Sequence, residues 1–265
     1  MKTYYVSLDR AQERRIHIQR HLALRQLDAV RIEAVDGEEL TREQLEVLCD
    51  MGRVDRLRHW LTNGAIACAL SHKRAYEQML QQGDRVAFIV EDDIWLPEDI
   101  GQILEAVEEE IGPDEIILLM ITSSLPAAFS RVGMKQLWKG GPGLCYPMDL
   151  SQTVCAAAYC IGRSAAEGLL RVNTPVAAVA DSWRWFHNNG AFASLRVLHP
   201  TRVTTMNFKS SIGYLSGLGA GAATLIDRLR PPFLHNWVAR RREQLLMAST
   251  GNFHLVDDPS PYMPT

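Results

Sequence analysis

Three adjacent acidic residues, Glu91, Asp92 and Asp93, follow the largely apolar run 85–90. Because side chains alternate along a strand, Glu91 and Asp93 point the same way at its carboxyl end, the edge at which open α/β sheets bind ligands. Adjacent carboxylates repel one another unless a cation holds them, and oxygen ligands suit Mg²⁺ or Mn²⁺. The triplet therefore predicts a divalent-cation site. The plainer interpretation is a solvated acidic turn in which Asp93 caps the following helix.

A cation at this position indicates one kind of chemistry above others, the transfer of a group from a nucleoside diphosphate. The ion would neutralise the diphosphate and stabilise the negative charge that grows on the leaving group. The chain as a whole does not supply that positive charge, since its 28 basic and 31 acidic side chains give a formal net charge of −3. Local arginines or a metal ion are therefore required to hold such a substrate.

The elements that would position these groups alternate along the chain. Strands are expected at 3–8, 30–35, 85–90, 115–122, 154–161 and 193–198. Helices lie between them; the clearest is 63–80, which has apolar residues at helical spacing. The segment 123–153 reads as a long irregular loop. This alternation predicts an α/β sandwich around a mostly parallel sheet.

The composition excludes several classes of protein. With 47% hydrophobic and 22% charged residues it is that of an ordinary globular chain, and it lacks the basic excess of a nucleic-acid binder. The five cysteines show no CxxC spacing, which favours reduced, buried thiols over a zinc site or a disulfide framework. No signal-peptide pattern and no run of ~18 apolar residues is present. We therefore expect a cytoplasmic protein, with peripheral contact to the inner face of the cytoplasmic membrane left open.

The C-terminal region has a different character from the rest of the chain. We expect a main domain over 1–212, followed at 213–265 by a glycine-rich hinge, a basic amphipathic helix and a disordered Pro-rich end. The basic helix contains Arg228, Arg230 and Arg240 among large apolar residues. Docking on an anionic membrane and packing on the main domain are both open interpretations.

Four segments, in order, resemble glycosyltransferase family 25, which includes lipopolysaccharide-biosynthesis and collagen galactosyltransferases. They are Val-Ser-Leu-Asp-Arg at 6–10 with Glu-Arg-Arg at 13–15, Ala-Val-Asp-Gly at 34–37, Gly-Ala-Ile-Ala-Cys-Ala-Leu-Ser-His at 64–72 and Phe-Ile-Val-Glu-Asp-Asp-Ile at 88–94. A weaker fifth segment at 158–167 is followed by Asp181. The likeness covers residues 3–212, and its most specific parts are the helix that ends in Ala-Leu-Ser-His and the Glu-Asp-Asp strand.

The resemblance implies a GT-A-like, Rossmann-type α/β/α sandwich, a UDP-sugar donor, most often UDP-galactose, and inversion at the anomeric carbon. It implies that Asp93 binds the metal, Mn²⁺ or Mg²⁺, directly. Glu91 reaches the metal through water or binds the ribose, and Asp92 lies close to the nucleotide. His199, from the last expected strand, is a candidate for a second metal ligand.

The same resemblance places the donor beside the first strand, so Ser7, Arg10 and Arg14 are expected to bind it. For Arg15 a solvated position on a basic helix face is the simpler interpretation. His72 lies on the apolar side of its helix, where a histidine is commonly a hydrogen-bonded core residue. The family likeness makes a position lining the donor site the alternative.

An inverting transfer needs one general base, because the attacking hydroxyl must lose its proton. Asp181 is the candidate, since it follows the apolar run 176–180 and partial burial would raise its pKa. The alternative role is to cap the helix through Trp183, and one residue could serve both. Trp183 and Trp185 are two apart and cannot share a helix face, so at least one is expected in the core.

Together these observations lead us to expect a metal-dependent hexosyltransferase. Its expected acceptor is a sugar hydroxyl of a lipopolysaccharide, a lipooligosaccharide or another bacterial surface glycan, including a lipid-linked one. Transfer from UDP-glucose or a UDP-N-acetylhexosamine is the alternative within the class. A nucleotidyltransferase is disfavoured because 7–10 contains no glycine. A non-catalytic glycan- or nucleotide-binding protein is the alternative from another class.

Overall fold

The computed structural model describes residues 1–58, 60–122, 127–206 and 253–264 of the chain. The strands of its central sheet are β1 (Lys2–Ser7), β2 (Ala29–Glu33), β3 (Val86–Glu91), β5 (Glu115–Leu118), β6 (Ala127–Gln136), β7 (Gly143–Pro147), β8 (Ala158–Gly162), β9 (Ser194–His199) and β11 (Phe253–Val256). A separate ribbon pairs β4 (Ile94–Trp95) with β10 (Thr204–Thr205). The helices are α1 (Gln12–Leu24), α2 (Arg42–Leu48), α3 (Met51–Arg56), α4 (Asn63–Gln82), α5 (Ile100–Glu110), α6 (Arg163–Val172) and α7 (Trp183–Asn188), with a 3₁₀ turn at Leu150–Gln152. Nowhere in these described ranges is a helix both long and apolar enough to cross a bilayer.

The strands of the large sheet are ordered β11-β6-β7-β9-β5-β8-β3-β1-β2. All of them run in one direction except β7 and β8, which confirms the expected mostly parallel sheet. In the parallel trio β2-β1-β3, Val6 lies opposite Glu91 and Ser7 lies opposite Glu33. The carboxyl ends of these three strands therefore meet at one edge, and the acidic triplet lies there.

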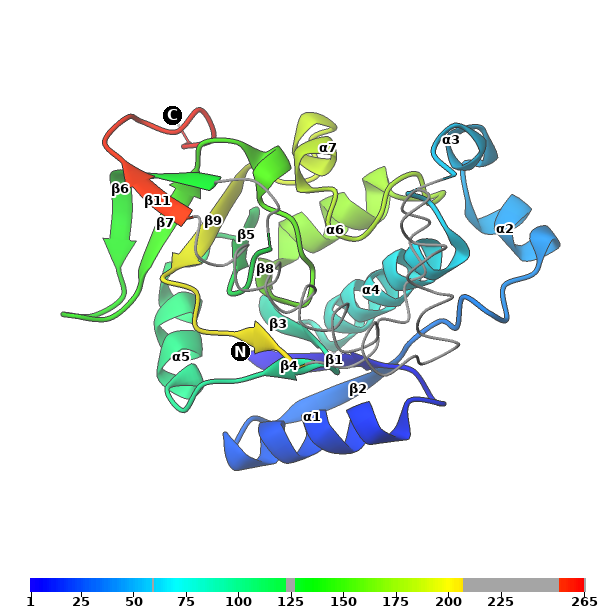
Figure 1. The fold of residues 1–265 in the computed structure, drawn as a ribbon, viewed down its shortest axis with the longest axis horizontal. Coiled ribbons are helices and arrows are strands. Elements are labelled where there is room, and N and C mark those ends of the chain that lie inside the picture. Colours follow the sequence, from blue (N-terminus) through cyan, green and yellow to red (C-terminus); the bar gives the residue numbers. More distant parts are fainter. Residues whose placement is uncertain (59, 123–126, 207–252, 265) are drawn as a thin grey trace, which may run out of the picture.

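Helices cover both faces of the sheet (Figure 1), which confirms the expected sandwich. One buried cluster joins α4, α6 and α7 to side chains such as Tyr4 and Ile89, and the other joins α1 and α5 to side chains such as Tyr5 and Phe88. Successive residues of β1 and β3 thus serve opposite faces, which explains why these strands are continuous apolar runs and do not alternate.

Helix α4 brings its amino terminus to the same edge as the triplet. Thr62 caps it by accepting a hydrogen bond from the Ala65 amide at 3.2 Å, and Gly83 ends it with a left-handed φ of 75°. The helix connects the parallel strands β2 and β3, so it runs back across the sheet from their carboxyl edge. Its face is apolar, with Ala75 and Met79 fully buried against the sheet.

Two expectations about irregular segments are wrong. The segment 123–153 contains the antiparallel pair β6 and β7. Residues 131–136 of β6 are exposed, so no buried face imposed an alternating pattern there, and β7 is a short buried run of five residues. The Pro-rich end was expected to be disordered, but the Ser260 hydroxyl within it donates to the Pro147 carbonyl, and β11, directly before it, pairs in parallel with β6. The expected hinge and basic helix, with Arg228, Arg230 and Arg240, lie outside the described residues.

Candidate functional site

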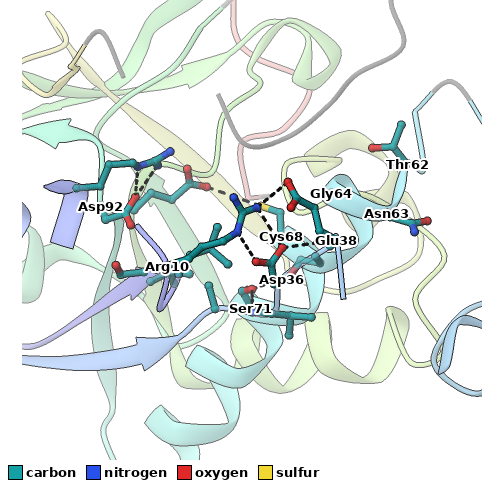
Figure 2. Close-up of a pocket in the computed structure, with 18 residues that line it drawn as sticks. Arg10, Asp36, Glu38, Thr62, Asn63, Gly64, Cys68, Ser71 and Asp92 are labelled. Carbon is teal, nitrogen blue, oxygen red and sulfur yellow. Dashed lines mark hydrogen bonds and ion pairs between the residues drawn. The ribbon is translucent and has the colours of Figure 1, made fainter. Parts of the chain in front are cut away.

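A cavity of about 310 Å³ opens between the carboxyl edge of β1 and β3 and the amino terminus of α4 (Figure 2). Its lining includes five residues that the sequence led us to expect at a donor site, namely Ser7, Arg10, Arg14, Glu91 and Asp92. The first three come from β1 and the start of α1, and the last two from the end of β3. The fold therefore brings together segments that are about 80 residues apart in the chain.

The acidic triplet is not a solvated turn. Asp92 is 4% exposed, and Arg14 pairs with its Oδ1 through Nε at 2.6 Å and through a terminal nitrogen at 2.5 Å. The same terminal nitrogen of Arg14 lies 2.9 Å from Asp93 Oδ2. After Asp93 the chain enters β4 and not a helix, so the capping interpretation is wrong. Arg14 is thus the residue that holds the two aspartates in place.

Asp93 has one oxygen without a partner. Its Oδ1 is buried and accepts no hydrogen bond from any described residue, while its main-chain carbonyl accepts one from Met206 at 2.6 Å. Burial, followed by the charge of Glu91, raises the pKa of Asp93 to about 7, although Arg14 acts in the opposite direction. A buried carboxylate oxygen that lacks a donor and lies within the field of a second carboxylate is the arrangement that a cation stabilises.

Glu91 rests on a buried hydrogen-bonded chain. Its Oε1 lies 3.3 Å from His72 Nε2, His72 Nδ1 lies 2.8 Å from the Tyr159 hydroxyl, and that hydroxyl lies 2.7 Å from the Tyr76 hydroxyl. Burial favours the neutral acid, but His72 and then Arg14 outweigh it, and the pKa of Glu91 is lowered. His72 is 1% exposed and does not line the cavity, so it lies behind Glu91 as a core histidine.

Asp181 lies next to this cluster without lining the cavity. Its Oδ2 accepts a hydrogen bond from the Cys155 amide at 3.0 Å, and burial followed by the charge of Glu91 raises its pKa. The cap of α7 is Ser182, so the expected capping role of Asp181 is wrong.

Cys155 has a φ of 114°, which a non-glycine residue adopts only when its surroundings hold it there. Trp183, fully buried, donates its indole N–H to the Cys155 carbonyl, so it is the core tryptophan that we expected.

His199 does not join the carboxylates. It ends β9, which β5 and β8 separate from β3, so about 14 Å of sheet lies between the two strands. Its ring packs against Phe129 at a centroid distance of 6.0 Å, and burial lowers its pKa. The expectation that His199 supplies a second ligand to a metal on Asp93 is therefore wrong.

The far wall of the cavity contains residues that were not named as site residues from the sequence, although Asp36 and Gly64 lie in segments that resemble the family. Asn63 and Gly64 begin α4, and their amides precede the first intrahelical hydrogen bond. Asp36, after β2, pairs with Arg10, whose terminal nitrogen also lies 3.0 Å from Glu38 Oε1 (Figure 2). The helix terminus and Arg10 offer N–H donors to an anionic ligand, although Asp36 and Glu38 now neutralise the charge of Arg10. The capping threonine before α4 was the sequence signal that could have found it.

Gly37 sets how closely the turn after β2 approaches α4. A Cβ at this position would lie 2.8 Å from both Asn63 O and Gly64 Cα, which are backbone atoms that cannot swing away. We expect Gly37→Ala to lower the free energy of unfolding by about 1–3 kcal/mol and to weaken binding in the cavity, because the turn must move off the helix terminus. Gly101→Ala is the matched control: no atom lies within 4 Å of its Cβ, and it is helical.

Urea unfolding and a ligand titration on the two variants measure this effect. Gly101→Ala should be neutral or slightly stabilising, because alanine favours a helix. If Gly37→Ala matched the wild type in both measurements, close packing of the turn on α4 would not be needed for the cavity.

Comparison with known proteins gives four findings. The sequence model of glycosyltransferase family 25 (LPS biosynthesis protein) matches residues 1–183. A "Glycosyltransferase 25 family member" of Anopheles gambiae is 33% identical over 34% of this chain and 16% of its own length. A Haemophilus influenzae protein named "Putative glycosyltransferase" is 26% identical over 68% of this chain and 61% of its own length. Human "Procollagen galactosyltransferase 2" is 22% identical over 64% and 27%.

The matched part of the chain thus spans less than two thirds of each of these relatives. Among solved structures, mannose-1-phosphate geranyltransferase from Thermus thermophilus covers 75% of this chain and 74% of its own, with 13% identity and a TM-score of 0.34. That score is too low for the likeness to bear on the site.

Proposed function

Because the chain belongs to glycosyltransferase family 25 and is therefore a glycosyltransferase, we propose that its cavity binds a UDP-sugar and that a hexose is transferred from it with inversion. The proposed donor is UDP-galactose, and the proposed acceptor is a sugar hydroxyl of a lipopolysaccharide, a lipooligosaccharide or another bacterial surface glycan. The description of the family as LPS biosynthesis proteins and the name of the human relative support these two choices. The observation that carries the proposal is the cavity at which Arg10, Arg14 and the α4 terminus meet Glu91 and Asp92, the first two residues of the acidic triplet.

The cavity has a size and a set of N–H donors that suit the nucleotide half of such a donor. Its volume of about 310 Å³ is at the lower end of the range for small-molecule sites. The amides of Asn63 and Gly64 and the guanidinium of Arg10 offer donors to phosphate oxygens. Arg10 forms ion pairs with Asp36 and Glu38. An anionic ligand would therefore replace these two carboxylates as the partner of its guanidinium.

The residues present fit a divalent cation, Mn²⁺ or Mg²⁺. Asp93 would hold it through the buried Oδ1 that lacks a partner, and Glu91 lies close enough to raise the pKa of Asp93. When bound, the ion supplies positive charge to the diphosphate of the leaving group. Arg14 keeps Asp92 and Asp93 in position through its ion pairs, and the buried His72 keeps Glu91 ionised.

Asp181 is the proposed general base. The acceptor hydroxyl gives its proton to the Asp181 carboxylate while its oxygen forms a bond to the anomeric carbon. The bond from that carbon to the diphosphate oxygen breaks, and UDP leaves with the electron pair. The Cys155 amide fixes the orientation of the carboxylate, and the raised pKa makes it a better proton acceptor than an exposed aspartate.

Incubation with a panel of UDP-sugars and oligosaccharide acceptors tests the function. We expect UDP release to be fastest with UDP-galactose and to require an acceptor, and NMR of the product should show the anomeric configuration opposite to that of the donor. Faster release from UDP-glucose or a UDP-N-acetylhexosamine would contradict the proposed donor, and a retained configuration would contradict inversion. Binding of UDP without release from any donor would favour the non-catalytic alternative.

Cation binding is expected to depend on pH. The pKa of Asp93 in the cation-free protein is about 7, so below pH 7 the cation must displace a proton. We expect the apparent affinity for Mn²⁺, read from the rise in melting temperature with UDP present, to fall about tenfold per pH unit below 7 and to level off above it. Asp93→Asn should abolish that dependence.

The stabilisation by UDP in the presence of EDTA shows whether the diphosphate is neutralised by a cation or by Arg14. If UDP stabilised the protein equally with EDTA and with Mn²⁺, the cation proposal would be contradicted, and Arg14 would be the counter-charge of the diphosphate.

We propose a cytoplasmic location, with the acceptor presented at the inner face of the cytoplasmic membrane. All five cysteines are free, as in proteins of reducing compartments. The basic segment that would contact the membrane lies outside the described residues, so this part of the proposal rests on its sequence. Flotation with anionic and with neutral vesicles tests it, since only the anionic ones should retain the protein.

A further inference from the structure

Three different ligand-type atoms meet beneath the cavity. Cys68 Sγ, His72 Nε2 and a carboxylate oxygen of Glu91 all lie within 4.8 Å of one another. Cys68 and His72 are four residues apart on α4, so they share one helix face, and Glu91 approaches from the end of β3. Figure 2 shows Cys68 beside the cavity, and its thiol donates to Glu91 Oε1 at 3.8 Å.

Two of the three separations between these atoms are close to those of a tetrahedral cation site. Zinc bonds of about 2.05 Å to nitrogen, 2.1 Å to oxygen and 2.3 Å to sulfur place the ligand atoms about 3.4 Å apart for N and O and about 3.6 Å apart for S and O. The corresponding distances to Glu91 Oε1 are 3.3 Å from His72 Nε2 and 3.8 Å from Cys68 Sγ. These two distances are within a few tenths of an ångström of the tetrahedral values, and the third, between Cys68 Sγ and the His72 nitrogen, is at most 4.8 Å.

The histidine is also oriented as metal-binding histidines are. Its Nδ1 contacts the Tyr159 hydroxyl at 2.8 Å, and Tyr76 extends this contact into the core. A partner of this kind on the second ring nitrogen holds the ring in place, so that Nε2 is aimed at a cation once the proton that it shares with Glu91 has left. His72 and Tyr159 are both buried, so the ring has a fixed position before any ligand arrives.

We propose that Cys68, His72 and Glu91 form a binding site for a soft divalent cation of the zinc class, with the fourth position open to the cavity. A thiolate and an imidazole select such an ion over Mg²⁺ and Mn²⁺, which separates this site from the all-oxygen position at Asp93. Cys68 and Glu91 line the cavity, which provides the entry path. On binding, the thiol proton and the proton that His72 Nε2 shares with Glu91 pass to solvent, and metal–sulfur and metal–nitrogen bonds form.

This site uses the same Glu91 that supports the donor cavity. A zinc-class ion there would bring positive charge to the cavity floor and withdraw Glu91 from the Asp93 side. The consequence is inhibition of transfer by zinc, and it rests on the proposed function. The binding itself does not, so the test below reads binding alone.

Titration of the reduced protein with Co²⁺ under anaerobic conditions is the test. Co²⁺ bound to a thiolate gives a sulfur-to-cobalt charge-transfer band, whereas Co²⁺ on carboxylates alone does not. We expect the band to saturate at one equivalent in the wild type and in Cys145→Ala, which removes a buried thiol on β7, and to be absent from Cys68→Ala. Absence of the band from the wild type, or its persistence in Cys68→Ala, would overturn the proposal.

A second measurement needs no variant. The rate at which iodoacetamide alkylates Cys68 in the wild type, followed by peptide mass spectrometry, should fall by about tenfold when Zn²⁺ is added, because the thiolate is then coordinated. The alkylation of the other four cysteines serves as the internal reference. An unchanged rate at Cys68 would overturn the proposal even if the variants failed to fold.

Discussion

Replacement of Asp93 with asparagine is expected to lower turnover by about 10²–10³-fold, the usual loss when a group that stabilises charge in the transition state is removed. Asparagine keeps the shape of the side chain and one oxygen, but it lacks the negative charge that would hold a cation beside the diphosphate. UDP release under saturating donor and acceptor measures the effect. The affinity for Mn²⁺ should fall in the same variant.

The same substitution should stabilise the cation-free protein at high pH. Asp93 has a folded-state pKa of about 7, above its ordinary value, so its ionised form opposes folding. That penalty is absent at pH 4, grows as the pH rises through 7, and is removed by asparagine. We therefore expect Asp93→Asn to melt at a higher temperature than the wild type at pH 8 in EDTA, and at the same temperature at pH 4.

Asp114→Asn is the matched control. Asp114 is also partly buried and its pKa is also raised by burial, but it precedes β5 and so lies at the opposite edge of the sheet. The Asp114→Asn variant should turn over the donor at the same rate as the wild type. If both Asp93→Asn and Asp114→Asn turned over the donor at the wild-type rate, the proposed role of the acidic triplet in the mechanism would be contradicted.

The parts of this fold that follow from sequence are those whose signal is local. A buried parallel strand is a short apolar run because both of its faces are covered, and β1, β3 and β5 carry that pattern. Helix α4 has an unambiguous cap at Thr62 and an unambiguous end at Gly83. The acidic triplet follows β3 directly, so its position at the carboxyl edge was predictable.

The parts that sequence could not give depend on which elements lie next to each other. His199 also ends a strand at the carboxyl edge, but the strand order puts β5 and β8 between it and Asp93. The order is set by packing across the whole sheet, and no local pattern encodes it. In the same way, Asp181 lies one residue before Ser182, the N-cap of α7. Its carboxylate accepts a hydrogen bond from the amide of Cys155, which is 26 residues earlier in the chain and which no local pattern could have indicated.

Long-range pairing also explains the cluster of Cys68, His72 and Glu91. The spacing of the five cysteines gave no reason to expect a thiolate ligand, and a single Cys-x-x-x-His pair on a helix is common in cores. Only the packing of α4 on β3 brings Glu91 to that pair. The exposed half of the β6–β7 pair and the C-terminal strand β11 were missed for a related reason, since neither has a face with a clear apolar pattern.

Asp181→Asn is expected to lower kcat by about 10²–10⁴-fold while leaving the affinity for UDP unchanged, because a general base acts on the acceptor hydroxyl and not on the nucleotide. Asparagine keeps an oxygen that accepts the Cys155 amide, so the strained φ at Cys155 should survive. Ser182→Ala is the control, since Ser182 begins α7 without a side-chain capping bond and should behave as the wild type.

The pH profile distinguishes a base from a residue that merely supports the loop at Cys155. Burial raises the pKa of Asp181, and a base works only when it is ionised. The acidic limb of kcat/KM in the wild type should therefore lie above the ordinary range of an aspartate, with activity lost as the pH falls through the raised pKa. In Asp181→Asn that limb should disappear along with most of the rate. A variant that kept the limb and lost only affinity for the acceptor would show that Asp181 positions the acceptor and that another group takes the proton.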